Sequence, residues 1–306
     1  MFSWKAVLFT GLILIGIRAL DPYPVEVIRL KGFDWLQQAD TPVHVKDIAL
    51  VNIGERSLAE KGQWPWPRKY ISELIDDLRA NGAGVIGMAI MFPEPDRFGG
   101  DADLADALSR NPAVVLGQTA SSRSIQGAAP HVGTAVMGGN AQDHLFKYPG
   151  ATRNLTVLEE SADGAGMLSS APEIDGVLRR LPLAVSVGDK VYPSFATDGN
   201  GRVWLRWNKT FQEVEAIDDL SAVRDKWVVI GVTAEGVSPL VPTPVGLKDA
   251  HIPLVTLLSA LINEDGLVRS NQANSLEIVA LPLLLLLVAY LARLPIKFVL
   301  PTFIIL

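Results

Sequence analysis

The chain has 306 residues, 49% of them hydrophobic, a formal net charge of −6 and no cysteine. The lack of cysteine excludes disulfides and thiolate metal sites. The mildly acidic balance, with lysine and arginine scattered along the chain, argues against nucleic acid as a partner. The length suits one large domain or two small ones, and the apolar residues concentrated at both ends indicate membrane segments.

The N-terminal segment is an unbroken stretch of apolar residues, threonine and glycine. It runs from Ala6 to Ile17, with Lys5 before it and Arg18 after it. We expect residues 1–20 to form an uncleaved transmembrane anchor whose aromatic and basic flanks lie at the membrane interface. A cleaved signal peptide is the alternative, but no small-x-small cleavage site follows the stretch.

Residues 24–39 predict an amphipathic helix that continues outward from this anchor. Lysine and arginine separate its apolar residues, which are Val27, Ile28, Leu30, Phe33 and Leu36. A helix in this place can couple the conformation of the following domain to the position of the membrane span.

Two apolar runs rich in strand formers enclose a helical pattern. The runs are 47–53 and 84–92, and the helical pattern covers 69–81 and closes at Gly82. Strand, helix and strand joined by short connections predict a right-handed crossover and a parallel strand pair. Both runs are apolar on both faces, which is typical of sheets covered by helices on each side.

The remainder of the region continues the alternation of helices and strands. Residues 118–170 show little periodicity and predict a long loop or an inserted subdomain. Asp175-Gly176 stands between strand formers and predicts a hairpin turn. The other expected elements are a helix at 101–110, strands at 113–116, 203–207 and 227–232, and a helix at 252–262.

The C-terminal end is apolar again. Residues 278–292 are interrupted only by Pro282, a polar break follows between Arg293 and Lys297, and residues 300–306 are apolar. This pattern predicts a span, a short cytoplasmic turn and the start of a further span. It favours a protein that continues past this segment over a buried hairpin.

These signals predict an α/β fold: a single extracytoplasmic domain with a mixed, partly parallel sheet and covering helices, flanked by transmembrane helices. The expected boundaries are residues 1–20 for the anchor, 21–275 for the extracytoplasmic domain and 276–306 for the C-terminal transmembrane segments.

The most distinctive stretch is Ser-Leu-Ala-Glu-Lys-Gly-Gln-Trp-Pro-Trp-Pro-Arg at 57–68. Phe-Pro-Glu-Pro-Asp at 92–96 and Asp-Gly-Val-Leu-Arg-Arg at 175–180 follow, and later Val-Thr-Ala at 232–234 with Pro-Thr-Pro at 242–244. Together with Asp34 after an aromatic residue, these motifs resemble the second type of CHASE domain, the cyclase- and histidine-kinase-associated sensory extracellular domain. The similarity covers about residues 21–270.

The resemblance implies a sensor between an N-terminal span and several C-terminal spans of a bacterial inner-membrane receptor, with the sensory domain in the periplasm. In this family a cytoplasmic adenylate cyclase, histidine kinase, Ser/Thr kinase or diguanylate cyclase usually follows. The resemblance also suggests a homodimer.

Two departures from the family pattern concern carboxylates. The family commonly has Asp after its first and second strands, where this chain has Gly54 and Ala89. Carboxylates at the carboxyl ends of adjacent parallel strands would lie where α/β sheets bind ligands. Their joint loss argues against a cationic or metal ligand and leaves open a degenerate site or a neutral or anionic ligand.

The Trp-Pro motif supplies the first candidate ligand-binding residues. Trp64 and Trp66 could form the wall of a pocket, or both rings could bury against the domain as a clamp. Arg68 could bind an anionic ligand at the start of its helix, or form an ion pair with Glu94 or Asp96.

Arg179 and Arg180 follow the predicted hairpin, so we expect one on each side of the strand. One would point inward to Asp175 or Glu94 and the other into solvent. The candidate ligand-binding residues are thus Trp64, Trp66, Arg68, Glu94, Asp175, Arg179 and Arg180.

No catalytic centre is expected in this chain, and neither a metal nor a cofactor. The four histidines show no ligand spacing, and there is no Gly-x-Ser-x-Gly or phosphate-binding Gly-x-x-x-x-Gly-Lys motif. The leading hypothesis is a receptor module for a small-molecule or protein stimulus. The alternative is a degenerate sensor domain that acts as a membrane-anchored interaction or assembly component.

Overall fold

A computed structural model describes residues 22–123, 145–194 and 202–267, with the single positions 9, 16, 20, 280 and 283. Apart from those positions, the predicted anchor and C-terminal spans lie outside the described residues. Within the described part, no helix is both long enough and apolar enough to cross a bilayer. Residues 34–267 form one compact unit, and residues 1–33 belong with 268–306 to a second.

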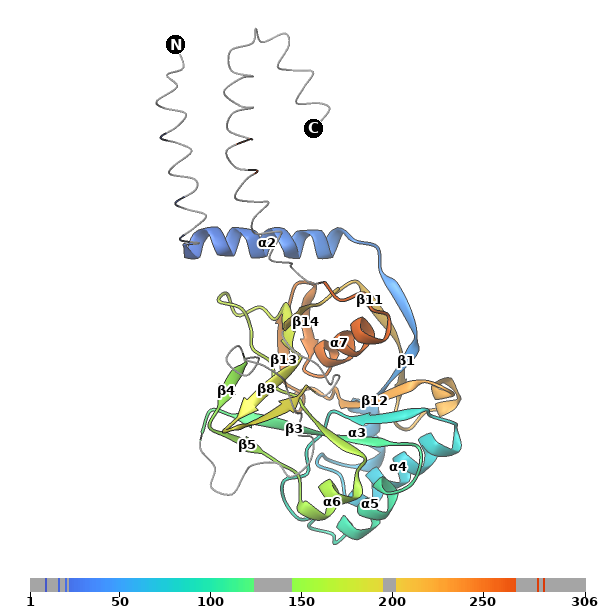
Figure 1. Ribbon diagram of the computed structural model, residues 1–306. Helices are drawn as coiled ribbons and strands as arrows, with labels where there is room; N and C mark the ends of the chain where they lie inside the picture. The colour runs from blue at the N-terminus through green and yellow to red at the C-terminus, as the bar shows by residue number, and fades with distance from the viewer. Residues whose placement is uncertain are drawn as a thin grey trace. The chain divides into compact units, whose positions relative to one another are not determined.

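The 34–267 unit is built on a seven-stranded mixed sheet (Figure 1). The strand order is β11-β1-β12-β2-β3-β5, and β6 also pairs with β3. The β3–β5 pair is antiparallel and the other pairs are parallel. The strands are β1 (Val43–Ile53), β2 (Val85–Met88), β3 (Val114–Ser121), β5 (Gly150–Thr152), β6 (Gly164–Met167), β11 (Lys209–Glu215) and β12 (Trp227–Val232).

The predicted first and second strands are present and parallel, but the prediction that they pair is wrong. One edge of β12 pairs with β1 and its other edge pairs with β2, so β12 separates them. Local crossover rules favour the nearest strand in sequence, whereas β12 is apolar on both faces and therefore suits a central position. The second strand is also shorter than predicted, because β2 ends at Met88.

Helices cover both faces of the sheet. The described helices are α2 (Tyr23–Ala39), α3 (Glu55–Lys61), α4 (Arg68–Ala80), α5 (Asp101–Leu108), α6 (Thr156–Ser161), the 3₁₀ helix η2 (Leu220–Val223) and α7 (Ile252–Ile262). Figure 1 shows α4, α5 and α6 on the side of the sheet away from α7. Successive side chains of β1 point to opposite faces of the sheet. Ala49, Val51 and Ile53 pack in the core under α4 and α5. Ile48 and Leu50 pack in the core under α7.

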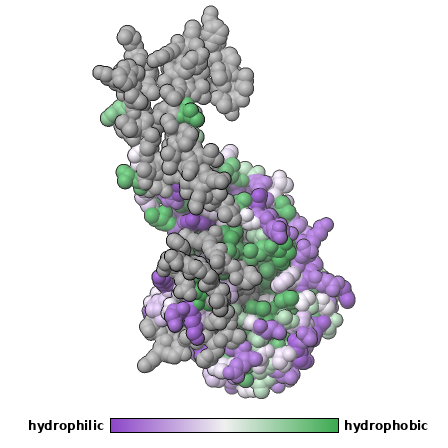
Figure 2. Space-filling model, viewed as in Figure 1, coloured by the Kyte–Doolittle hydropathy of each residue, from purple (hydrophilic) through white to green (hydrophobic). Residues whose placement is uncertain are grey.

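The α7 helix matches its predicted bounds. Its sequence is apolar except for Thr256 and Ser259, and both of these residues are buried. In Figure 2 hydrophobic atoms gather in the region of α7, while hydrophilic side chains are frequent over much of the rest of the described surface. This face of the sheet is therefore covered by a helix that is buried over most of its circumference.

Three small sheets complete the unit. They are β4 (Phe146–Tyr148) with β8 (Ala184–Val187) and β9 (Lys190–Pro193), β7 (Arg180–Pro182) with β10 (Arg202–Trp204), and β13 (Leu240–Thr243) with β14 (Gly246–Asp249). The excursion predicted at 118–170 contains regular structure: the end of β3, then β4, β5, α6 and β6. Short strands of three or four residues have too few side chains for a periodic signal, which explains why they were missed.

The predicted helix at 69–81 is confirmed with small changes, whereas the predicted hairpin at Asp175-Gly176 is present only as a turn. α4 begins one residue before the predicted start and ends ahead of Gly82, which has the positive φ of +82° that glycine tolerates. Asp175-Gly176 forms a turn, closed by a bond from Glu173 N–H to the Val177 carbonyl (2.9 Å). Strands do not flank it directly, because Leu178 N–H donates instead to the Pro242 carbonyl (2.8 Å).

Candidate functional site

The predicted ligand-binding residues fall into two separate groups. Trp64, Trp66, Arg68 and Glu94 line one cavity of about 350 Å³, which we call the Trp-Pro cavity and which residues 64–66, 68 and 91–97 surround. Asp175, Arg179 and Arg180 are not among its lining residues and form a cluster of their own.

The two tryptophans have different environments. Trp66 is 3% exposed, packs in the main core, and donates its Nε1–H to the Gly62 carbonyl (2.9 Å). Trp64 is half-buried, with its ring centroid 6.0 Å from that of Trp66 and the planes at 56°. Trp66 is therefore buried against the domain, as the alternative interpretation expected, while Trp64 is only partly buried and lines the cavity.

Arg68 is held mainly by neighbours other than the predicted carboxylates. Its Nη2 donates to the backbone carbonyl of Glu94 (3.0 Å), its Nε lies 3.5 Å from Asp101, and its guanidinium lies 4.5 Å from the Phe92 ring. Burial lowers the pKa of Arg68, and the charges of Asp101 and Asp96 oppose that shift. Arg68 thus pairs with Asp101 of the adjoining helix α5 instead of the predicted Glu94, whose side chain is exposed.

Asp96 organises the loop below Arg68. Its carboxylate accepts the backbone N–H groups of Arg68 (3.1 Å) and Gly100 (3.0 Å). Burial alone would raise the pKa of Asp96, but these backbone hydrogen bonds outweigh it and lower the pKa. The carboxylate thus stabilises the N-terminus of α4, because the first N–H groups of a helix have no acceptor within the helix itself.

Arg179 is the best-enclosed charged residue of the second cluster. Its side chain is fully buried between two carboxylates: Asp34 lies 2.6 and 2.8 Å away, and Asp175 lies 2.7 and 2.8 Å away. Burial by itself would lower the pKa of Arg179, but the bonds to Asp175 and Asp34 raise it above its ordinary value. The pairing with Asp175 is as predicted, and Asp34 at the end of α2 is an additional partner.

The prediction that the second arginine, Arg180, points into solvent is wrong. Arg180 forms an ion pair with Glu173 and lies with its guanidinium 4.6 Å from the Trp204 ring. The β7–β10 pairing aligns Arg180 with Trp204, which places the arginine against an aromatic face instead of water. Both arginines of the motif thus serve ion pairs within the described fold.

A carboxylate from another strand occupies the space beside Gly54. Glu215, at the end of β11, accepts hydrogen bonds from Gly54 N–H (3.3 Å) and from the Ser57 hydroxyl. A Cβ at position 54 would overlap the Glu215 carboxylate and come within 3.1 Å of the Thr233 hydroxyl. The chain therefore has a carboxylate at this edge of the sheet although residue 54 itself is glycine.

A cavity that the sequence interpretation missed lies on the α7 face at the same edge of the sheet. This α7 pocket has a volume of about 350 Å³ and is lined by Asn52, Trp207, Lys209, Thr210, Phe211, Glu213, Thr233, Val245, Lys248, Asp249, Ile252 and Thr256. Asn52 was the available signal, because it continues the register of Ile48 and Leu50 on β1 with a polar side chain. Its Nδ2 donates to Glu213 on β11 (3.1 Å).

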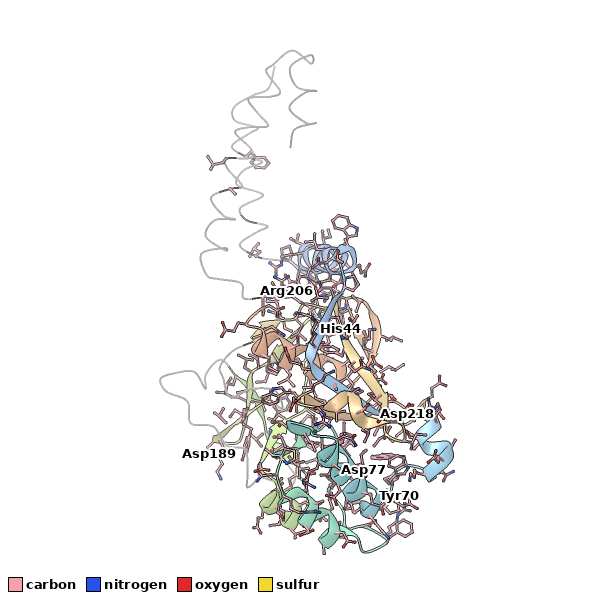
Figure 3. The ribbon with its side chains drawn as sticks, turned by 90° about the vertical axis from the view of Figure 1, so that its right-hand side faces the viewer. His44, Tyr70, Asp77, Asp189, Arg206 and Asp218 are labelled. Carbon is pink, nitrogen blue, oxygen red and sulfur yellow. The ribbon has the colours of Figure 1, made fainter. Side chains whose placement is uncertain are left out.

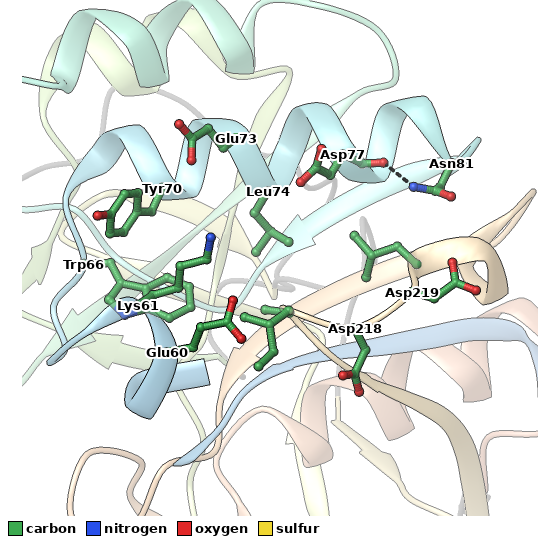
Figure 4. Close-up of a pocket in the computed structure, with 13 residues that line it drawn as sticks. Glu60, Lys61, Trp66, Tyr70, Glu73, Leu74, Asp77, Asn81, Asp218 and Asp219 are labelled. Carbon is green, nitrogen blue, oxygen red and sulfur yellow. Dashed lines mark hydrogen bonds between the residues drawn. The ribbon is translucent and has the colours of Figure 1, made fainter. Parts of the chain in front are cut away.

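A third cavity, of about 300 Å³, lies between α3, α4 and the loop after β11 (Figure 4). Figure 3 shows Tyr70 and Asp77 on α4 and Asp218 on that loop. The five acidic residues that line this third cavity are all exposed: Glu60, Glu73, Asp77, Asp218 and Asp219. Exposed carboxylates attract cations in general without selecting among them.

Metal ligation has no candidate in the described residues. Among them, no three His, Asp or Glu side chains are grouped in a way that could hold an ion. His131 and His144 lie outside the described residues.

Comparison with known proteins gives one family. The model of the CHASE2 domain matches residues 9–292 of this chain, which is more than nine-tenths of its length. No curated protein and no solved structure matched.

Proposed function

The chain belongs to the CHASE2 domain family, whose members are extracellular sensory domains of signalling proteins, and on this premise we propose that it is the periplasmic receptor module of a bacterial inner-membrane protein. The observation that carries the proposal is the extent of the match. Residues 9–292 reach from the apolar N-terminal stretch to the apolar C-terminal stretch, so the sensory domain and its predicted flanking spans fall within one family unit.

We further propose that the domain relays its stimulus through α2. The last turns of this helix carry side chains that bond to distant parts of the 34–267 unit. Asp34 binds Arg179, Gln37 accepts the backbone N–H of Trp207 (2.8 Å), and Gln38 donates to the Pro244 carbonyl (2.6 Å). A change in those loops therefore acts directly on α2, which continues N-terminally toward the predicted anchor.

The output that receives this signal is proposed to be a cytoplasmic domain of the type associated with the family, such as an adenylate cyclase or a histidine kinase. A stimulus shifts the equilibrium between two states of the domain only through different affinities for them. The proposal thus requires a ligand or protein that binds one arrangement of α2 and its contacts more tightly than another.

Cysteine labelling tests the location of the domain. The chain has no native cysteine, so Asp189→Cys, at an exposed turn, gives a single reactive thiol. A membrane-impermeant maleimide added to intact spheroplasts should label Asp189→Cys but not Arg293→Cys, which belongs to the predicted cytoplasmic turn. Protection of Asp189→Cys until the membrane is permeabilised would place the domain inside the cell and refute the proposal.

A second experiment separates a receptor from an assembly component. The full chain in nanodiscs is heated with and without candidate small molecules, since a ligand that binds the native state raises the Tm. Ligand-dependent stabilisation supports the receptor. A defined protein partner that co-purifies in fixed stoichiometry, with no small molecule changing the Tm, supports the assembly role.

A further inference from the structure

We propose that the α7 pocket binds a free amino acid as the ligand of this domain. The inference rests on the proposed sensory function and names the chemical class of stimulus for it.

The pocket offers charges of both signs. Lys248 and Asp249, neighbours on β14, both line it, and Glu213 lines it from β11. The other lysine in the lining, Lys209, forms an ion pair with Asp265 and is thereby neutralised. A wholly anionic ligand would meet two carboxylates, and a wholly cationic one would meet Lys248, whereas a zwitterion can pair with both signs.

Two buried polar atoms in the lining have no partner among the described residues. Trp207 is 5% exposed and its indole Nε1–H has no acceptor, while the Oδ1 of Asn52 has no donor. A buried donor or acceptor without a partner costs about 1–3 kcal/mol, so a ligand that supplies the missing bonds here gains that free energy on binding. One is a donor and the other an acceptor, which again requires a ligand with both.

The chemistry of an amino acid matches these groups one by one. Its carboxylate pairs with the Lys248 ammonium and accepts the Trp207 indole N–H. Its ammonium pairs with Asp249 and donates to the Oδ1 of Asn52. Its side chain faces the apolar part of the lining, which is Val245, Phe211 and Ile252. The volume of about 350 Å³ also suits a molecule of this size.

The pocket is connected to the proposed relay. The backbone N–H of Trp207, a lining residue of the pocket, donates to Gln37 of α2 (2.8 Å). Pro244, the neighbour of the lining residue Val245, accepts a bond from Gln38 of α2 (2.6 Å). A ligand that moves either wall thus changes a contact of α2 directly.

Binding is tested on the full chain in nanodiscs by isothermal titration calorimetry and thermal unfolding. Each standard L-amino acid is the probe, compared with the matching amine, which lacks the carboxylate, and the matching acid, which lacks the ammonium. We expect at least one amino acid to bind and raise the Tm, and neither half-molecule to do so.

The variants Lys248→Gln and Trp207→Phe assign the binding to this pocket. Lys248 is exposed and Trp207→Phe removes the indole N–H while keeping an aromatic ring, so both variants should fold. Each should weaken the Kd of the bound amino acid about tenfold or more, because each removes a bond to its carboxylate. Lys190→Gln, an exposed lysine on β9, is the matched control and should leave the Kd unchanged.

The inference is overturned if no amino acid binds, or if one binds equally well to the wild type and both pocket variants. The half-molecules binding as tightly as the amino acid would also refute it. The cysteine-labelling experiment is independent of this result, so the sensory function could stand while the assigned ligand class fails.

Discussion

Gly54 shows how a single backbone position is tied to a side chain from a distant strand. Glu215 fills the space beside it and accepts its N–H. We predict that Gly54→Asp destabilises the protein by about 1–3 kcal/mol at neutral pH, because the new carboxylate overlaps and repels that of Glu215.

The double variant Gly54→Asp with Glu215→Ala checks this explanation. It should recover most of the lost free energy of unfolding, since the second change removes both the overlap and the repulsion. Urea denaturation of the wild type, the two single variants and the double variant measures the coupling. Additive losses would mean that the two residues do not compete for this space.

His251 gives the stability a pH dependence of known sign. The residue is 4% exposed and its ring lies 2.6 Å from where a Cβ of residue 231 would stand, so no larger residue fits at Gly231. Burial lowers the pKa of His251 to about 4, against the opposing effect of Asp249. His251 therefore stays neutral in the folded state at pH values below about 6.5, where the unfolded state binds a proton at this residue.

The contribution of neutral His251 is therefore present above pH about 6.5 and falls as the pH is lowered towards about 4. Over this window we expect a loss of about 3 kcal/mol relative to a His251→Gln variant, because each pKa unit corresponds to about 1.4 kcal/mol. Guanidinium unfolding of both proteins at several pH values measures it. Parallel pH curves for the two proteins would contradict the prediction.

The attachment of the helix α2 depends on Arg179. Its replacement in Arg179→Met removes the guanidinium that lies between the carboxylates of Asp34 and Asp175, each 9% exposed at the side chain. We predict a loss of about 3–5 kcal/mol, together with faster amide hydrogen exchange at the end of α2.

The matched control is Arg56→Met, which breaks an exposed ion pair with Asp218. Exposed pairs contribute about 0–1 kcal/mol, so this variant should unfold near the wild-type midpoint. Equal losses for the two variants would show that enclosure of the Arg179 cluster contributes nothing.

Sequence periodicity predicted the elements themselves better than their partners. α4, α7 and β12 have strong local patterns, and each was found close to its predicted bounds. The place of β12 between β1 and β2 depends on contacts between segments that are far apart in the sequence. A local sequence pattern does not reveal such contacts. The same holds for Arg179, whose partner Asp175 is four residues away and was predicted, whereas Asp34 is 145 residues away and was not.

The site was predictable only in part for a related reason. The Trp-Pro motif drew the interpretation to the Trp-Pro cavity, where three of its four predicted residues lie close in sequence. The α7 pocket draws its lining from β1, β11, β14 and α7 and carries no contiguous motif. Asn52 alone, a polar residue in an apolar strand, indicated it.

For the protein as a whole, we predict a homodimer joined along α2. Large hydrophobic side chains are exposed on this helix: Tyr23, Ile28, Trp35 and Leu36 are 56–72% exposed. Ile28 and Trp35 are seven residues apart and so share one face. Trp35→Glu should shift the full chain from two copies to one in nanodisc mass measurements, and a wild-type protein already monomeric would contradict this.

The central position of β12 has a consequence for the order in which the sheet can assemble. Because the chain is synthesised from its N-terminus, β1 and β2 are exposed long before Trp227–Val232 are available to join them. Until then each presents an open row of backbone groups, the kind of edge on which chains aggregate. Chaperones that shield such nascent edges should therefore matter more for the yield of this protein than for domains whose neighbouring strands are consecutive.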